Sequence, residues 1–306
     1  MFQVNWAPHI RDKATTTGLM WQVLVALVPA LIAAVYFFGK PALVVIVSTS
    51  VAAVATEAVI LLLRKKKLQT LLDGSALLTG LLLAMNLPPS LPWWVPAIGA
   101  FVAIAFAKHA FGGLGMNIFN PALIGRAFLL ASYPVMMTFW SQPITAVTTA
   151  TPLGMAKEVG LSHAMQAFSY WQSFVGMIPG SLGETSKVAL LIGAAFLLLR
   201  RVIDWKIPFS YLFTVAVFAF LAGQDIGFHL LSGGLILGAF FMATDYVTSP
   251  VTPWGRIIFG AGAGILTMVI RLWGGYPEGV CYAILIMNML VPFLDKVRFQ
   301  KAMYLK

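Results

Sequence analysis

A short loop rich in hydroxyl groups, Thr145 to Leu153, is the first feature of this sequence that suggests chemistry. Its sequence is TAVTTATPL, and it places hydroxyls at Thr148, Thr149 and Thr151 among residues with little bulk. Hydroxyls in exposed, polar backbone can be esterified by a modifying enzyme, and small neighbours leave room for that enzyme. An ordinary Ser/Thr turn has the same composition, so the loop alone leaves both interpretations open.

Charged residues within or beside apolar segments are a second group of candidates, because each such charge costs about 2.5 to 3.5 kcal/mol on insertion into hydrocarbon. They are Glu57, Asp73, Arg126, Asp225, Asp245, Arg271 and Glu278. Asp73, Asp225 and Arg271 lie near segment ends, where solvation or snorkelling explains them. We expect Arg126 to hold an anionic or carbonyl group or, more simply, to pair with Asp245. Glu278 lies in a Gly/Pro loop, where it either meets a ligand or a cation or only packs.

Cysteine and histidine argue against a metal site built by this chain alone. Cys281 is the only cysteine, so neither a disulfide nor a self-contained iron–sulfur or zinc site can form. A lone cysteine in an apolar segment is most often a small packing residue. His109 and His229 have no second ligand at metal-binding spacing, and we expect both to be polar residues at the membrane interface. Any metal cluster must therefore come from a partner.

The elements that position these residues are apolar segments. The chain has 306 residues, is 60% hydrophobic and contains only 10 acidic residues. This composition predicts an all-α polytopic membrane protein with about ten spans of the length that a bilayer requires, some of them broken by Gly or Pro. The segments are Met20 to Phe38, Ala42 to Leu63, Leu68 to Leu87, Trp94 to Phe111, Pro121 to Phe139, Val188 to Leu199, Pro208 to Ala222, Phe228 to Thr244, Ile257 to Trp273 and Val280 to Leu294. The first segment is too long for a cleaved signal, and we expect the N-terminus to be retained.

The basic residues predict the orientation in the membrane. The formal net charge is +10, but the basic residues fall at segment ends rather than on a face with interleaved aromatics, which argues against nucleic-acid binding. With the N-terminus inside, one set of residues lies on the cytoplasmic side: Arg11, Lys13, Arg64 to Lys67, Lys108, Arg200, Arg201, Lys206, Arg256, Lys296, Arg298, Lys301 and Lys306. The other side keeps Lys40, Lys157 and Lys187. The positive-inside rule then places both termini in the cytoplasm and Thr151 outside.

An internal repeat indicates how the spans are arranged. The segment from Gly80 to Pro89 is followed by the glycine-rich stretch from Gly112 to Asn117, and the segment from Gly238 to Pro250 is followed by the stretch from Gly274 to Gly279. In the predicted topology the two units run in opposite directions, which favours an inverted repeat of five helices each. Glycine-rich helix packing can mimic such a pattern.

The long polar stretch between the halves divides the chain. We predict a first membrane half over 1–140, an extracytoplasmic segment over 141–187 and a second membrane half over 188–306. The middle segment holds the threonine loop, His163 and an aromatic stretch from Phe168 to Phe174 that is typical of a short interfacial helix.

Several motifs now resemble a known family. They are Asn117 to Phe128 (NIFNPALIGRAF), Thr148 to Pro152 (TTATP), Gly183 to Ser186 (GETS), Ala243 to Asp245 with Thr248 to Pro250, and Gly274 to Gly279 (GGYPEG). In this order they resemble the D subunit of the Rnf ion-translocating electron-transport complex. More distantly they resemble the B subunit of the sodium-translocating NADH:quinone oxidoreductase. That subunit usually has a longer N-terminal extension than the short segment ahead of Met20.

This resemblance implies an electron-relay subunit in a bacterial or archaeal plasma membrane. It implies FMN joined through its phosphate to Thr151 by a separate flavin transferase, ferredoxin/NAD electron transfer coupled to Na⁺ or H⁺ translocation, and partner subunits that include an iron–sulfur protein. Arg126 and Glu278 are candidates for contact with the flavin, and some relatives also hold riboflavin. The chain departs from the family's usual loop, because Thr145 stands where an acidic residue is common.

One alternative from another class stays open. An inverted repeat of five plus five helices also serves solute channels and transporters, and fold does not set function. The hydroxyl loop favours the electron-relay interpretation. A scaffold subunit with an unmodified Thr151 is a third possibility.

Overall fold

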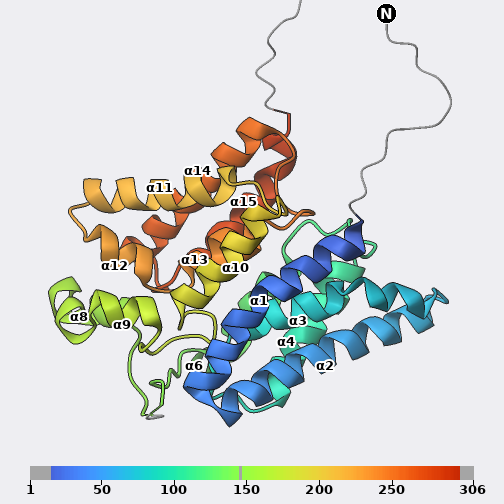
Figure 1. Cartoon of the computed structure of the whole chain (residues 1–306), viewed down its shortest axis with the longest axis horizontal. Coiled ribbons are helices and arrows are strands. Elements are labelled where there is room, and N and C mark those ends of the chain that lie inside the picture. The colour runs from blue at the N-terminus through green and yellow to red at the C-terminus, as the bar shows by residue number, and fades with distance from the viewer. Residues whose placement is uncertain (1–14, 145–146, 297–306) are drawn as a thin grey trace, which may run out of the picture.

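The computed structural model describes residues 15–144 and 147–296, and these residues form helices joined by loops (Figure 1). Within these ranges the one extended pairing is an isolated bridge between Ser141 and Thr148. The helices of the first half are α1 (Thr16–Phe38), α2 (Lys40–Leu63), η1 (Leu68–Asp73), α3 (Ser75–Met85), α4 (Trp94–Val102), η2 (Ala103–His109), α5 (Pro121–Ser132) and α6 (Pro134–Met137). Those of the middle segment are α7 (Pro152–Glu158), α8 (Leu161–Ala167) and α9 (Tyr170–Val175). The second half contains α10 (Lys187–Leu199), α11 (Lys206–Leu221), α12 (Ile226–Leu231), α13 (Leu235–Leu237), η3 (Gly238–Met242), α14 (Pro253–Trp273) and α15 (Val280–Leu294).

Apolar residues cover both sides of the longest helices, as they do in a membrane. Helices α1, α2 and α14 are long and apolar enough to cross a bilayer by length and composition, and shorter apolar helices include α10, α11 and α15. Large hydrophobic side chains such as Ile32, Val51 and Phe213 are exposed on these helices. A soluble protein rarely exposes so much apolar surface, so we assign these faces to lipid or to partner helices.

Three of the predicted spans are interrupted, and a fourth changes its helical hydrogen bonding. The segment 68–87 is a 3₁₀ turn followed by α3, the segment 121–139 breaks between α5 and α6, and 228–244 consists of α12, α13 and the π-helix η3. The segment 94–111 changes from the α-helix α4 to the π-helix η2. Gly74, Pro134 and Gly233–Gly234 stand at the three breaks. Breaks at Gly and Pro agree with the expectation from the sequence, and the count of about ten spans stays a prediction.

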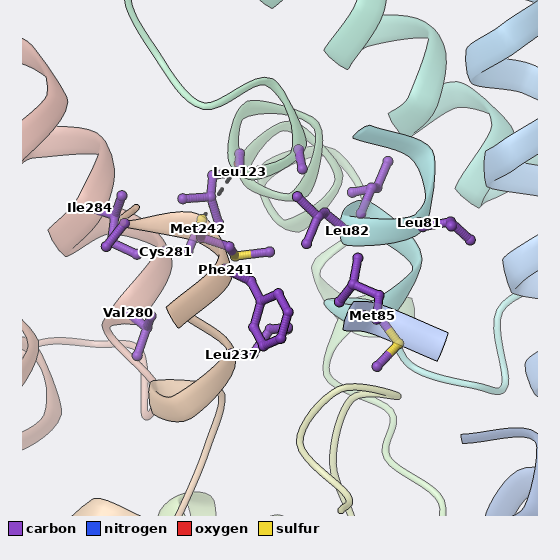
Figure 2. Packing of buried hydrophobic residues seen from close by; sticks show 14 of the residues in the cluster. Leu81, Leu82, Met85, Leu123, Leu237, Phe241, Met242, Val280, Cys281 and Ile284 are labelled. Atoms are coloured by element: carbon purple, nitrogen blue, oxygen red, sulfur yellow. Dashed lines mark hydrogen bonds between the residues drawn. The ribbon is translucent and has the colours of Figure 1, made fainter. Parts of the chain in front are cut away.

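The two halves meet along matching helices. Helix α1 packs against α10 (Figure 1). Helix α5 packs against α15, so each of these helices of the first half contacts a helix of the second. At the interface of the two halves, Leu82 and Met85 of α3 lie opposite Phe241 and Met242 of η3 (Figure 2). These helices carry the two segments that began the predicted repeat. The interrupted helices thus lie at the centre of the molecule.

Cys281 belongs to the same central cluster. Its thiol is buried and donates a hydrogen bond of 3.5 Å to the carbonyl oxygen of Leu123 (Figure 2). Asn120 crosses the interface as well, because its Nδ2 donates to the Met242 carbonyl oxygen at 3.2 Å. The structure confirms that Cys281 is a packing residue.

The order of packing is similar in the two halves. Helix α2 packs against α4 and α4 against α5, while α11 packs against α14 and α14 against α15. In the second half, glycines allow close approach: a Cβ at Gly260 would lie 2.5 Å from the Ile207 carbonyl oxygen, and one at Gly264 would lie 2.9 Å from that of Tyr211. Small residues four apart are a common way to bring membrane helices together.

The segment 141–187 lies at the opposite end of the molecule from the ends of the described chain. In Figure 1, α8 and α9 are at the lower left, whereas the first turn of α1 and the last turn of α15 are at the upper right. Helix α9 confirms the short helix predicted in the aromatic stretch, and a capping box from Ser169 and Gln172 begins it. Of the basic residues used for topology, Arg11, Lys13, Arg298, Lys301 and Lys306 lie outside the described residues.

Candidate functional site

Backbone hydrogen bonds join the threonine loop to the residues that precede it. Ser141 bridges to Thr148, and the amide of Thr149 donates to the Trp140 carbonyl oxygen at 3.1 Å. Thr148 is exposed and Thr149 is half-buried. Thr145, where the chain departs from the family's loop, lies outside the described residues.

Thr151 is the residue that begins helix α7. Its Oγ1 accepts a hydrogen bond from the amide of Gly154 at 3.0 Å, and Pro152 follows at the first helical position. This is the usual role of threonine before a helix. Thr151 is only 4% exposed. The exposed hydroxyl expected from composition is therefore buried at Thr151, and the residues around it must move before an enzyme can reach this hydroxyl.

Helix α7 fixes the threonine loop against the loop 274–279. The ammonium of Lys157, at the last turn of α7, donates to the carbonyl oxygen of Gly274 and lies 3.5 Å from that of Tyr276. At the other end of α7, Leu153 lies against Gly233, which also adjoins Arg271 and Glu278. Helix α7, which directly follows the threonine motif, thus contacts the motif from Gly274 to Gly279, although Lys157 and Gly274 are 117 residues apart in sequence.

Arg126 pairs with Glu278, not with Asp245. Its guanidinium donates to the Glu278 carboxylate through Nη2 and to Asn86 Oδ1 through Nη1 at 3.1 Å. Asp245 instead accepts from Thr248 Oγ1 at 3.0 Å. The predicted Arg126–Asp245 pair was wrong because α5 faces the start of α15, and this brings the loop 274–279 over Arg126. The two residues expected to contact the flavin are therefore direct partners of one another.

An aromatic pocket opens beside this pair. It encloses about 450 Å³, including its open mouth, and its lining combines the Arg126–Glu278 pair with the rings of Trp140, Tyr276 and Tyr282. The two tyrosine rings stack with centroids 5.2 Å apart. Because Trp140 also receives the hydrogen bond from Thr149, the pocket adjoins the threonine loop. Apolar and aromatic walls with few convergent polar groups are typical of a site for a planar organic ligand.

Arg271 is buried rather than snorkelling to the interface. Its guanidinium donates to three carbonyl oxygens, those of Glu278 at 3.1 Å, His229 at 2.6 Å and Ser232 at 3.0 Å. Three backbone acceptors satisfy the guanidinium where α12 ends, so this arginine joins α14 to two loops. The expectation for Arg271 was wrong, whereas Asp73 and Asp225 do lie at helix ends, where each accepts backbone amide hydrogen bonds.

The histidines are buried too. His229 is at the end of α12, and neither ring nitrogen has a hydrogen-bond partner among the described residues. His109 contacts Glu57, with Nε2 3.3 Å from Oε1. Both rings are buried within the protein, and the expectation that they lie at the depth of the membrane interface stays a prediction. Within residues 15–144 and 147–296, no three His, Cys, Asp or Glu side chains gather as a metal site would require.

A second cavity lies on the other side of the central cluster. It encloses about 730 Å³ with its open mouth, and its polar lining comes from Ser75, Thr79, Lys108, Asn117, Asn120, Thr244 and Asp245. Lys108 points its ammonium to Glu57, 2.8 Å from both carboxylate oxygens, and to Ser75 Oγ at 2.6 Å. The pair is almost completely buried. The sequence pattern predicts a free cytoplasmic charge at Lys108, but this charge is compensated inside the protein.

Removing one partner of the Lys108–Glu57 pair should strongly destabilise the chain. Lys108→Met leaves the Glu57 carboxylate buried without its cation, which costs about 3 to 5 kcal/mol. We expect the double variant Lys108→Met/Glu57→Gln to recover most of this loss, since no buried charge is then unpaired. Unfolding by SDS in mixed micelles measures the free energy of unfolding of the single and the double variant.

Lys206→Met is the matched control, because the Lys206–Asp204 pair is partly exposed and should contribute less than about 1 kcal/mol. Equal losses in Lys108→Met and Lys206→Met would contradict the prediction.

Sequence reasoning missed three residues around Arg126. Asn86, Glu184 and Lys187 are all buried within this part of the molecule. The charge pattern predicts an outer loop position for Lys187, yet its ammonium donates to the Glu184 carbonyl oxygen. Glu184 belongs to the motif from Gly183 to Ser186, which contributed only to the family resemblance. The sequence signal that could have identified Glu184 was an acidic residue in a short motif just before the predicted span from Val188 to Leu199.

The fold and the site together define a multi-pass helical membrane protein whose two halves enclose a charged, aromatic-lined pocket beside a hydroxyl-rich loop. Residues 3–304 match the model described as the NQR2, RnfD, RnfE family, and the chain belongs to this family. The protein is 48% identical to the D subunit of the proton-translocating ferredoxin:NAD⁺ oxidoreductase complex of Clostridium ljungdahlii, over 97% of this chain and 94% of that protein.

Two further relatives have the same subunit designation. The D subunit of the Na⁺-translocating ferredoxin:NAD⁺ oxidoreductase complex of Acetobacterium woodii is 50% identical over 96% of this chain and 92% of its own length. The D subunit of the ion-translocating oxidoreductase complex of Stutzerimonas stutzeri is 41% identical over 93% and 91%. The resemblance to the Rnf D subunit drawn from the sequence motifs is confirmed.

Proposed function

We propose that this chain is the electron-relay subunit of an ion-translocating ferredoxin:NAD⁺ oxidoreductase complex, and that it carries FMN esterified through its phosphate to Thr151. The observation that carries the proposal is that α7, which Thr151 begins, contacts the loop 274–279 through Lys157, while the threonine loop adjoins through Trp140 the pocket that contains Arg126 and Glu278. The names of the similar proteins indicate the kind of complex.

The residues present fit a flavin. Trp140, Tyr276 and Tyr282 offer ring faces for a planar isoalloxazine, and Arg126 and Glu278 offer a donor and an acceptor at the pocket wall. A cation beside the ring would favour its reduced, more negative form. The flavin supplies the redox chemistry; the chain binds and orients it. An isolated solute transporter would need no such pocket beside a modifiable hydroxyl.

The second cavity offers polar groups for a further ligand. Asn117, Asn120 and Thr244 line it and could contact a ring carbonyl or a ribityl hydroxyl of riboflavin. Its free volume of about 60 Å³ is below the usual range for small-molecule sites, so the cavity has to widen to admit the ligand. We propose this cavity as the place of the non-covalent riboflavin that some relatives hold. With two flavins in one chain, an electron would cross the membrane in two shorter steps.

Partners and membrane follow from the same proposal. Since Cys281 is buried and alone, an iron–sulfur cluster on the electron path must come from another subunit. Attachment of FMN requires a flavin transferase that reaches Thr151 from outside the cytoplasm. The coupling ion is Na⁺ or H⁺, as in the two similar complexes. We place the chain in a bacterial or archaeal plasma membrane.

Denaturing electrophoresis under ultraviolet light tests the cofactors directly. Covalent FMN should remain with the protein band and fluoresce, whereas riboflavin should appear in the supernatant after acid precipitation. A dark band from protein isolated with its transferase co-expressed would refute the covalent flavin.

Cysteine labelling tests the orientation. With Cys281 replaced by alanine, a cysteine at position 157 should react with an impermeant maleimide in intact cells, and one at position 66 only after permeabilisation. Both positions are exposed, so access depends on the membrane alone. The expectation follows from the basic residues at the other end of the molecule. Labelling of position 157 only after permeabilisation would reverse the orientation.

A further inference from the structure

Two carboxylic acids from separate motifs lie against the same pair of glycines in the interior, next to the aromatic pocket. A Cβ at Gly234 would lie 3.8 Å from Glu184 Oε1, and one at Gly233 would lie 4.0 Å from Glu278 Cγ. Glu184 lies in the loop between α9 and α10, and Glu278 lies in the loop between α14 and α15. Their exposed fractions are 2% and 7%. Two ionised carboxylates in contact repel one another, and burial penalises each charge further.

Glu278 already has a cation, but Glu184 does not. Arg126 donates to the Glu278 carboxylate and to Asn86, and its Nε has no acceptor among the described residues. Lys187 donates to the backbone carbonyl of Glu184 rather than to its carboxylate. Arg271 uses its donors on carbonyl oxygens. The three nearby cations therefore leave the Glu184 carboxylate without a direct partner.

One oxygen of the Glu184 carboxyl group has no donor. Its Oε1 is buried and has no hydrogen-bond partner among the residues that the structure describes. The backbone encloses it closely, since a Cβ at Gly180 would lie 2.7 Å from Oε2 and one at Gly234 would lie 3.8 Å from Oε1. An ionised carboxylate without donors in such a place is costly, whereas a protonated one needs only an acceptor. Glu278 is that acceptor.

We propose that Glu184 and Glu278 form a buried proton-binding site in which the two carboxyl groups share one proton. Glu184 carries the proton and donates it as a hydrogen bond to the Glu278 carboxyl group, which also accepts a hydrogen bond from Arg126. The site does not depend on the flavin, although Glu278 also lines the aromatic pocket. A negative charge placed in that pocket would raise the affinity of the pair for a second proton, taken from water.

Electrostatics agree with this arrangement. Burial first, and then the charge and hydrogen bond of Glu278, raise the pKa of Glu184 to about 8, against the opposing effects of Arg126 and Lys187. Because this pKa is raised, the shared proton is present at neutral pH and is lost as the pH rises through about 8.

Infrared spectroscopy of the full chain in lipid tests the proposal, because a protonated carboxylic acid has a C=O stretching band that a carboxylate lacks. We expect the wild-type protein to show such a band at neutral pH, to shift it in D₂O, and to lose it as the pH is raised. Glu184→Gln should remove the band. Glu278→Gln should keep a band that titrates at lower pH, because Glu184 then loses its carboxylate neighbour.

Matched variants show whether the band belongs to this pair of carboxyl groups. Glu158→Gln changes an exposed carboxylate and should leave the band unchanged. Thr151→Ala should also leave it unchanged, so a failure of the flavin proposal does not affect the test. If Glu184→Gln does not fold, the D₂O shift and Glu278→Gln still decide the outcome. A wild-type spectrum without a band that titrates near pH 8, or a band unaffected by Glu184→Gln and Glu278→Gln, would overturn the proposal.

Discussion

Thr151→Ala should abolish the flavin fluorescence of the denatured protein band completely, since it removes the only oxygen to which we assign the FMN phosphate. Thr148→Ala should retain the full signal, although Thr148 is exposed and Thr151 is buried. The difference follows from the Thr-Ala-Thr-Pro end of the loop, which resembles the family's attachment site. In-gel fluorescence, with protein stain as the loading reference, measures both.

Stability must be controlled in this comparison, because Thr151 also caps α7. Loss of such a cap costs about 0.5 to 2 kcal/mol. Thr151→Ser keeps a hydroxyl that can cap the helix, so it should fold like the wild type and shows whether serine can accept FMN. A bright band from Thr151→Ala together with a dark band from Thr148→Ala would move the attachment site to the exposed hydroxyl.

The isolated chain, purified with its FMN attached, should be reduced by dithionite but should not turn over NADH or reduced ferredoxin. The described residues form membrane helices and short surface helices, without a Gly-rich nucleotide loop, and the sequence has a single cysteine. A flavin on the outer face is separated from cytoplasmic donors by a hydrocarbon core of ~30 Å. Other subunits must therefore deliver the electrons.

Activity of the assembled complex is the reference for this measurement. Adding the partner subunits should restore reduction of the covalent flavin by the physiological donor, followed by its absorbance change. Oxidation of NADH or ferredoxin by the isolated chain at the rate of the intact complex would contradict the relay function. Reduction by dithionite shows in the same sample that the flavin is accessible and intact.

Several features of this protein were determined by its sequence alone. Apolar segment composition identified the membrane class, and the lone Cys281 excluded a self-contained cluster. Local hydrogen bonding is also readable in sequence: Asp225 begins α12, and Asp73 accepts a hydrogen bond from the amide of Ser75, the first residue of α3, which agrees with their positions at segment ends. Such features depend on neighbours within a few residues, so periodicity and residue type suffice to predict them.

The partners of the buried charges were decided only by the tertiary structure. Arg126 and Glu278 are 152 residues apart in sequence, and their contact exists because α5 and α15 meet at the interface of the two halves. Lys108 looked like a topology signal until the packing of η2 against α2 brought it to Glu57. Residue type says that a buried charge needs a partner, but only the packing of helices distant in sequence decides which residue that partner is.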